Sequence, residues 1–381
     1  MKNEMLKPNL GWVDWLRVVA CFLVVFSHCC DGFVAEFDND RNSFVVGVLL
    51  GSAVRPCVPL FVMMTAVLLL PVPSGMEISA FYRKRVGRLV VPLAFWSMVL
   101  PLAFYLYFNT FGATTHNPAI PLDTYSADNL WNKIVFFVLN FNFDTTPLWY
   151  LYMLIGVYLI MPIISSWLEG ASKNDILVVL KVWGVSLLLP YVKLLAPLFG
   201  YSGNYGNMNI LGGCDWSDYT AFYYISGFVG YLILVYYLKK YPYVGSWKKL
   251  LSWGLPMFLF GYLVTSFGYI YVQNFFPGNY AYLEILWWFC GVNVFMMTLP
   301  VFLVFQKWNP RGGRAIRFFA KLTFGIYLCH FIVVQISYDL FDVSGIPVFF
   351  RIICMALTSF VFSAFVSALF SLTKFTSRFV K

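Results

Sequence analysis

Charged residues are scarce in this chain. Only 11% of its 381 residues are Asp, Glu, Lys or Arg, whereas 60% are hydrophobic. Soluble globular domains carry about 25% charged residues, so the composition excludes that class. The mean hydropathy of +0.74 supports the same conclusion. We therefore predict an integral membrane protein.

Histidines and patterned cysteines are also few. The chain has three histidines, and its eight cysteines show neither a C-x2-C spacing nor a pairing pattern. This argues against a metal site or a disulfide framework, and favours cysteines that act as small buried apolar side chains. Internal repeats, low-complexity tracts and linkers are absent as well. We predict one membrane domain that occupies residues 1–381.

Long apolar runs are abundant instead. About ten of them are long enough to cross a bilayer as helices. They are residues 12–30, 44–70, 89–108, 147–167, 176–199, 219–238, 250–275, 283–305, 322–341 and 348–372. No signal-peptide pattern precedes the first run, so we expect it to be retained. The predicted fold is an all-α bundle of about ten transmembrane helices.

The basic residues predict the orientation of this bundle. Most of the 26 Lys and Arg residues lie in alternate loops and at the two ends of the chain. They would face the cytoplasm if both termini were cytoplasmic, which is the positive-inside pattern. The formal net charge of +9 is therefore a topology signal, and binding to nucleic acid is a poor explanation of it.

An arginine and a histidine are placed in phase within the first apolar run. On a helix, the spacing from Arg17 to His28 returns to within about 20° of the same face, some 16 Å further along. Asp14 lies on that face too. Because an ionised group near mid-bilayer costs about 2.5 kcal/mol or more, these residues must face protein or water.

A basic cluster precedes the third apolar run. It contains Arg83, Lys84, Arg85 and Arg88. Guanidinium groups beside a helix start can bind a polyanion, such as the phosphates of a nucleotide or of coenzyme A. The alternative is that the cluster only follows the positive-inside rule or contacts lipid headgroups.

Two predicted outer loops, 109–146 and 200–218, are longer than a connection requires. Both are rich in aromatic and amide side chains, which suit sugar rings but also form ordinary interfacial belts. These side chains are Tyr125, Trp131, Asn140, Asn142, Tyr201, Asn204, Tyr205, Asn207, Asn209, Trp216 and Tyr219.

Five segments form an ordered pattern along the chain. The first is WVDWLRVVACFLVVFSHCC (12–30), in which Arg17 and His28 have an R-x10-H spacing, and the others are residues 55–70, 81–96, 147–162 and 322–334. In this order they resemble the successive segments of acyltransferase family 3, a family of multi-span membrane enzymes that O-acylate bacterial glycans and whose opening helix has R-x10-H as its hallmark. One departure is Thr65 and Ala66, where the family usually has Ser-Gly.

The resemblance implies a function. Family members are taken to use cytosolic acetyl-CoA, so Arg83, Arg85 and Arg88 would hold its phosphates, while Arg17 and His28 would be the catalytic pair. The acceptor would be a cell-surface polysaccharide or its lipid-linked precursor. The chain looks closest to the short stand-alone type, which implies a multi-pass protein of the bacterial cytoplasmic membrane.

The chemistry of acyl transfer fits a histidine at position 28. A sugar hydroxyl is a poor nucleophile, and an imidazole can accept its proton near pH 7, which typically accelerates a reaction ~10²- to 10⁴-fold. Asp31 could orient the ring if the helix continues that far. Direct transfer and an acetyl-histidine intermediate both remain open, as do acetyl and succinyl donors.

Other ionisable groups have open roles. His330 matches a family position, and both a packing hydrogen bond and a site role are compatible with it. Arg55 would either pair with an outer carboxylate or bind the acceptor. Glu284 would lie at the membrane interface, assist His28 or bind the acceptor. Two other functional classes are alternatives: a transporter of polysaccharide or lipid-linked sugar, and a haem or metal protein with His28 and His330 as ligands.

Overall fold

The computed structural model describes residues 10–139, 141–201, 223–342 and 345–381. Regular structure within these residues is entirely helical, which confirms the predicted all-α fold. Nine stretches among them are long and apolar enough to cross a membrane. They are Gly11–Val34, Arg41–Leu69, Ile78–Phe108, Ala127–Gly170, Lys173–Leu195, Trp247–Phe275, Tyr280–Trp308, Arg314–Leu340 and Val348–Phe370.

These nine stretches overlap nine of the predicted apolar segments. The remaining segment, 219–238, begins outside the described residues, and its described part forms helix α10 (Val229–Lys240). The chain divides into two compact units by its internal contacts. Unit 1 contains residues 1–47, 87–152 and 301–381, and unit 2 contains residues 48–86 and 153–300.

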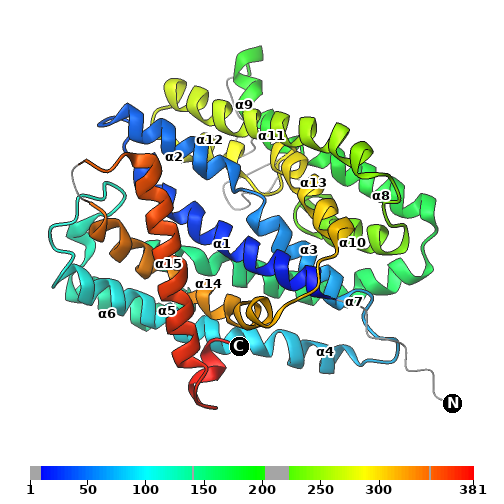
Figure 1. The fold of residues 1–381 in the computed structure, drawn as a ribbon, viewed down its shortest axis with the longest axis horizontal. Helices are drawn as coiled ribbons and strands as arrows, with labels where there is room; N and C mark the ends of the chain where they lie inside the picture. Colours follow the sequence, from blue (N-terminus) through cyan, green and yellow to red (C-terminus); the bar gives the residue numbers. More distant parts are fainter. Residues whose placement is uncertain (1–9, 140, 202–222, 343–344) are drawn as a thin grey trace. The chain divides into compact units, whose positions relative to one another are not determined.

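Unit 1 is built around α1. Its helices are α1 (Gly11–Val34), α5 (Gly87–Phe108), α6 (Ala127–Phe136), α14 (Arg314–Leu340) and α15 (Val348–Phe370), with the 3-10 turns η1 (Leu122–Thr124), η2 (Phe137–Leu139), η3 (Phe143–Leu148) and η7 (Thr376–Phe379). Helix α14 packs along both α1 and α15 (Figure 1). The core of this unit is therefore a three-helix packing with α14 in contact with both partners.

Two glycines allow close approach within unit 1. A Cβ at Gly325 would lie 2.1 Å from Ser367 Oγ, so α14 and α15 can meet only because no side chain stands there. A Cβ at Gly11 would lie 2.2 Å from the Gly312 amide nitrogen. Small residues at such contacts are typical of helix packing in membranes.

Unit 2 contains the remaining helices. They are α3 (Cys57–Leu69), α4 (Ile78–Arg85), α8 (Lys173–Ser186), α9 (Leu189–Leu195), α10, α11 (Trp247–Phe275), α12 (Tyr280–Trp287), most of α7 (Trp149–Gly170) and α13 (Val292–Trp308), and the 3-10 turns η4 (Ala196–Phe199) and η6 (Tyr223–Ile225). Helix α2 (Arg41–Ala53) crosses the unit boundary. In this unit α10 packs against α3 and α8, and α11 packs against α12.

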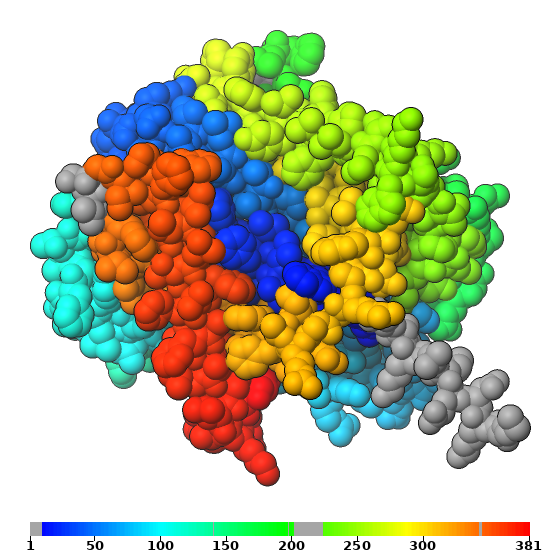
Figure 2. Space-filling model, viewed as in Figure 1, coloured from blue at the N-terminus to red at the C-terminus, as the bar shows by residue number. Residues whose placement is uncertain are grey.

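The outward face of α15 shows how the apolar surface is used. This helix lies on the visible face of the molecule in Figure 2, and large apolar side chains project from it. They are Leu357, Val361, Phe362, Phe365 and Leu369, each at least 46% exposed. Such a face is stable against lipid tails and costly against water, which agrees with a membrane-spanning role.

Candidate active site

His28 and Asp31 form a hydrogen-bonded pair toward the carboxyl end of α1. The helix continues to Val34, so it carries the anticipated partner one turn beyond the histidine. His28 Nδ1 lies 2.7 Å from Asp31 Oδ2. The side chain of His28 is 18% exposed and that of Asp31 is 42% exposed. The predicted contact is thus present in the structure.

This contact assigns the tautomer of the neutral ring. A carboxylate oxygen can only accept a hydrogen bond, so the Nδ1–H of His28 donates to Asp31. The lone pair is then on Nε2, where it can accept a proton. A carboxylate in this position also stabilises the imidazolium that forms after proton uptake. The pair therefore has the properties of a general base.

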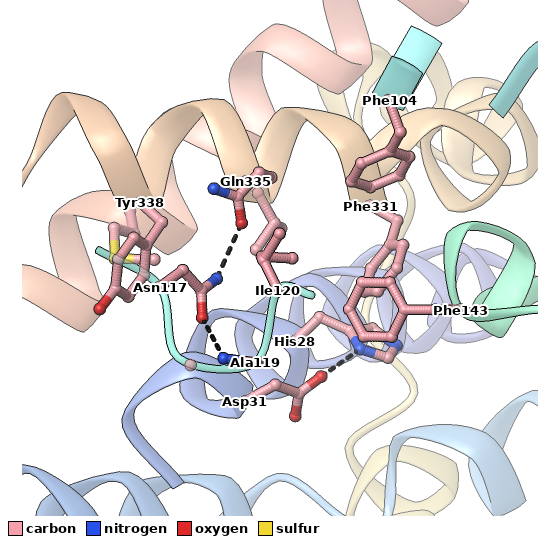
Figure 3. Close-up of a pocket in the computed structure, with 13 residues that line it drawn as sticks. His28, Asp31, Phe104, Asn117, Ala119, Ile120, Phe143, Phe331, Gln335 and Tyr338 are labelled. Carbon is pink, nitrogen blue, oxygen red and sulfur yellow. Dashed lines mark hydrogen bonds and ion pairs between the residues drawn. The ribbon is translucent and has the colours of Figure 1, made fainter. Parts of the chain in front are cut away.

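A small cavity adjoins the pair. Its volume is about 40 Å³, enough for about three water molecules. Figure 3 shows Phe143 and Phe331 beside the His28 ring and the Asp31 carboxylate directed at it. The other lining residues are Gly32, Phe104, Asn117, Ala119, Ile120, Val334, Gln335, Tyr338 and Met355. All of them belong to unit 1.

The segment after α5 covers this cavity through a polar network. Asn117 Nδ2 donates to Gln335 Oε1 (2.8 Å), and the Ala119 amide donates to Asn117 Oδ1 (3.0 Å) (Figure 3). Gln335 Nε2 in turn donates to Asp339 Oδ2 (2.9 Å), which also accepts from the Tyr107 hydroxyl (2.7 Å). These bonds tie the covering segment to α14.

Asn117 and Gln335 are site residues that the sequence reasoning missed. The available signal was a pair of polar side chains, Gln335 and Asp339, four residues apart within an apolar run. Residues at that spacing share a helix face. The cover from residues 115–120 could not be found this way, because a loop's path depends on tertiary contacts.

His330 lies behind His28 in the core. It is fully buried, and its ring centroid is 5.2 Å from that of His28, at an interplanar angle of 42°. Its Nδ1 lies 2.6 Å from the carbonyl oxygen of Tyr327. It does not line the cavity. The two histidines that the sequence placed on separate apolar runs are therefore neighbours.

Arg17 occupies the other end of α1. Its side chain is 28% exposed, and its guanidinium lies 3.8 Å from the Asp14 carboxylate. The straight helix separates it from His28 by about 16 Å, and it does not line the cavity. The first turn of α1 packs against the turn before α14, where the Trp15 indole donates to the Arg311 carbonyl oxygen (3.3 Å).

The basic cluster spans the last turn of α4 and the first turn of α5, which are consecutive along the chain. Arg83 and Arg85 are in the last turn of α4, and Arg88 is the second residue of α5. Arg83 and Arg88 are exposed and Arg85 is half-buried. Their charges are thus accessible to an anion, and the amino end of α5 lies beside Arg88.

Arg55 and Glu284 contact each other in unit 2. Arg55 lies in the break between α2 and α3 and is buried, with its guanidinium 3.8 Å from the exposed Glu284 carboxylate. The guanidinium also lies over the rings of Trp287 (4.3 Å) and Phe289 (4.8 Å), where α12 ends. The two helix interruptions therefore meet at Arg55.

The aromatic residues expected to bind sugar have varied positions. Tyr125 is buried, and its hydroxyl donates to Asp144 Oδ1 (2.8 Å). Trp131 is 67% exposed on α6, and Asn142 caps η3. Neither Tyr125, Trp131 nor Asn142 lines the His28 cavity. Asn140 and residues 204–219 lie outside the described residues.

Metal ligands do not converge in the described part of the chain. No group of three or more His, Cys, Asp or Glu side chains that could hold a metal ion is found there. The seven cysteines within the same residues are free thiols, and six of them are buried. Cys214 lies outside these residues.

Comparison with known proteins places the chain in a family. No curated protein and no solved structure matches it. A family model described as an acyltransferase domain matches residues 10–372, nearly the whole chain. Together with the R-x10-H pair on α1 and the nine apolar helical stretches, this match shows that the chain belongs to acyltransferase family 3, the membrane acyltransferases.

Proposed function

We propose that this membrane acyltransferase moves an acetyl group from cytosolic acetyl-CoA to a hydroxyl of a cell-surface polysaccharide or its lipid-linked precursor. The observation that carries the proposal is the His28–Asp31 pair at 2.7 Å beside a cavity. Membership of a membrane acyltransferase family and the nine apolar helical stretches support acyl transfer as the reaction class. We further propose that the protein resides in the bacterial cytoplasmic membrane.

The residues near the cavity account for the proton transfers. Asp31 holds the Nδ1–H of His28, and Nε2 removes the proton from the acceptor hydroxyl as its oxygen attacks the thioester carbonyl carbon. The carbon–sulfur bond then breaks, and the coenzyme A thiolate takes the proton from the imidazolium. Atoms and charges balance without any further reactant.

The lining of the cavity suits a sugar hydroxyl. Asn117 and Gln335 supply amide donors and acceptors, while Phe331 and Phe143 supply flat apolar faces. With a volume of about 40 Å³, the cavity admits a hydroxyl-bearing edge rather than a complete sugar ring. We infer that most of the saccharide stays outside it.

The proposal is tested by replacing the base. His28→Ala should abolish acetyl transfer from radiolabelled acetyl-CoA to envelope glycans while expression and membrane insertion stay normal. His116→Ala is the matched control, because that histidine is 82% exposed and its Nδ1 also lies 2.7 Å from a carboxylate, that of Asp342. Normal transfer by His28→Ala would refute the assignment.

Two further measurements would identify the acceptor and test the alternative function, a transporter. Deleting the gene and quantifying ester-linked acetyl groups on each surface glycan would reveal the acceptor. Within the described residues, the helix interruptions that meet at Arg55 favour a transporter, since discontinuous helices often form substrate sites. Translocation of a lipid-linked saccharide without acetylation, in vesicles that contain the purified protein, would support transport instead.

A further inference from the structure

One ring nitrogen of His330, in the core of unit 1, has no hydrogen-bond partner among the described residues. Its Nδ1 lies 2.6 Å from the Tyr327 carbonyl oxygen, and because that oxygen can only accept, Nδ1 carries the proton. The other ring nitrogen, Nε2, is buried and has no hydrogen-bond partner among the described residues. Buried polar atoms of this kind are rare, and a ligand is one explanation of them.

The environment of the ring determines what Nε2 can do. No carboxylate lies within ion-pair distance of His330 in the described part of the chain, and an imidazolium buried without such a partner is strongly disfavoured. The neutral ring has its lone pair on Nε2. The atom that fills this position must therefore be a hydrogen-bond donor, an N–H or an O–H.

The position of His330 indicates which substrate supplies that donor. Val334 is one turn further along α14 and lines the His28 cavity, whereas His330 does not line it. The proposed orientation takes α14 from the cytoplasmic side at Arg314 to the outer side at Leu340, so His330 is about 6 Å closer to the cytoplasm than Val334. An acyl donor that arrives from the cytosol therefore reaches the level of His330 before it reaches the cavity.

We propose that His330 Nε2 accepts a hydrogen bond from the amide N–H of the pantetheine arm, next to the thioester of the acyl donor. This inference rests on the proposed function. The amide is separated from the sulfur by two carbons, so a thioester beside the His28 ring brings that N–H near a second ring whose centroid is 5.2 Å away. His330 is thus a donor-binding residue, and His28 is the base.

Two substitutions separate this role from a packing role. His330→Asn keeps an N–H at the Nδ1 position, where it donates to Tyr327, but removes the acceptor at Nε2. His330→Gln places an amide oxygen at the Nε2 position but gives up the bond to Tyr327. Ligand binding predicts that His330→Asn raises the KM for acetyl-CoA about tenfold and that His330→Gln stays near wild type. A purely structural role predicts the opposite order.

Two small donors test the identity of the partner. S-acetyl-N-acetylcysteamine carries the amide N–H, and its analogue with an ester oxygen in place of that N–H does not. Wild-type protein should prefer the amide donor about tenfold in kcat/KM, and His330→Asn should lose this preference. If the two donors respond equally to His330→Asn, or if only the KM of the saccharide changes, the inference is wrong.

The outcomes distinguish this inference from the function on which it rests. Wild-type protein that neither binds coenzyme A nor transfers acetyl groups would overturn the proposed function. Active wild-type protein that shows no preference between the two donors would overturn the inference alone. That comparison needs no variant, so it holds even if His330→Asn fails to fold.

Discussion

Two histidines in this protein have the same kind of partner, an aspartate carboxylate, but different surroundings. His28 and His116 each place Nδ1 2.7 Å from an aspartate oxygen. The His28 side chain is 18% exposed and lines a cavity, whereas that of His116 is 82% exposed. Water can form hydrogen bonds with an exposed imidazole, so a carboxylate partner by itself does not identify a catalytic base. Partial burial beside a small cavity distinguishes His28.

At the residue scale, Asp31→Asn tests how the base is oriented. The amide can hold the ring by its oxygen or its nitrogen, so the correct tautomer is no longer enforced, and the imidazolium loses its counter-charge. We expect kcat to fall by about 10²-fold or more while the KM for acetyl-CoA changes little. Initial rates with saturating donor would measure this.

The control for that experiment is Asp38→Asn. Asp38 is exposed beyond the end of α1 and does not line the cavity, so its removal should leave the rate unchanged. A rate for Asp31→Asn that equals the Asp38→Asn rate would contradict the assigned role of the carboxylate.

At the element scale, a buried ion pair links α6 to η3. Asp144 is fully buried, and Lys133 Nζ lies 2.6 Å from its Oδ2. The Tyr125 hydroxyl donates to its other oxygen, because burial and the Asp144 carboxylate both raise the pKa of Tyr125 and keep the hydroxyl protonated. The neighbouring residue, Phe143, lines the His28 cavity. The ion pair therefore fixes one wall of the site.

Lys133→Met should destabilise this region. The substitution leaves the Asp144 carboxylate buried without a cation, which typically costs about 3–5 kcal/mol. We expect a lower thermal unfolding midpoint in detergent and a lower transfer rate, because Phe143 is no longer held. The double variant Lys133→Met/Asp144→Asn removes the unpaired charge and should recover much of the loss. Absence of any recovery would show that the pair is not the cause.

At the scale of the whole molecule, the proposed function would require a donor on one side of the membrane to reach an acceptor on the other. Helix α1 spans that distance by itself, with Arg17 near one end and His28 near the other. Arg83 and Arg88 of the basic cluster are exposed, and in the proposed function they would bind the phosphates of the donor.

Phosphate binding by the basic cluster leads to a prediction at this scale. Arg83→Ala, Arg85→Ala and Arg88→Ala should each raise the KM for acetyl-CoA about tenfold and leave the KM for the acceptor unchanged, because each removes charged hydrogen bonds to phosphate. Lys248→Ala, an exposed cation in the first turn of α11, is the control for general loss of basic charge. An unaltered acetyl-CoA titration in all three variants would disprove phosphate binding by these arginines.

The sequence by itself determined the fold class, the apolar helical stretches and the family, because hydrophobic length and residue spacing along one helix are local properties. It also placed Asp31 within reach of His28, since both lie on α1. It could not place His330 behind His28, bring Asn117 over the cavity or bury Tyr125 against Asp144. These contacts join distant segments. Only tertiary packing decided them, because their geometry depends on how α1, α14 and the outer loop pack together.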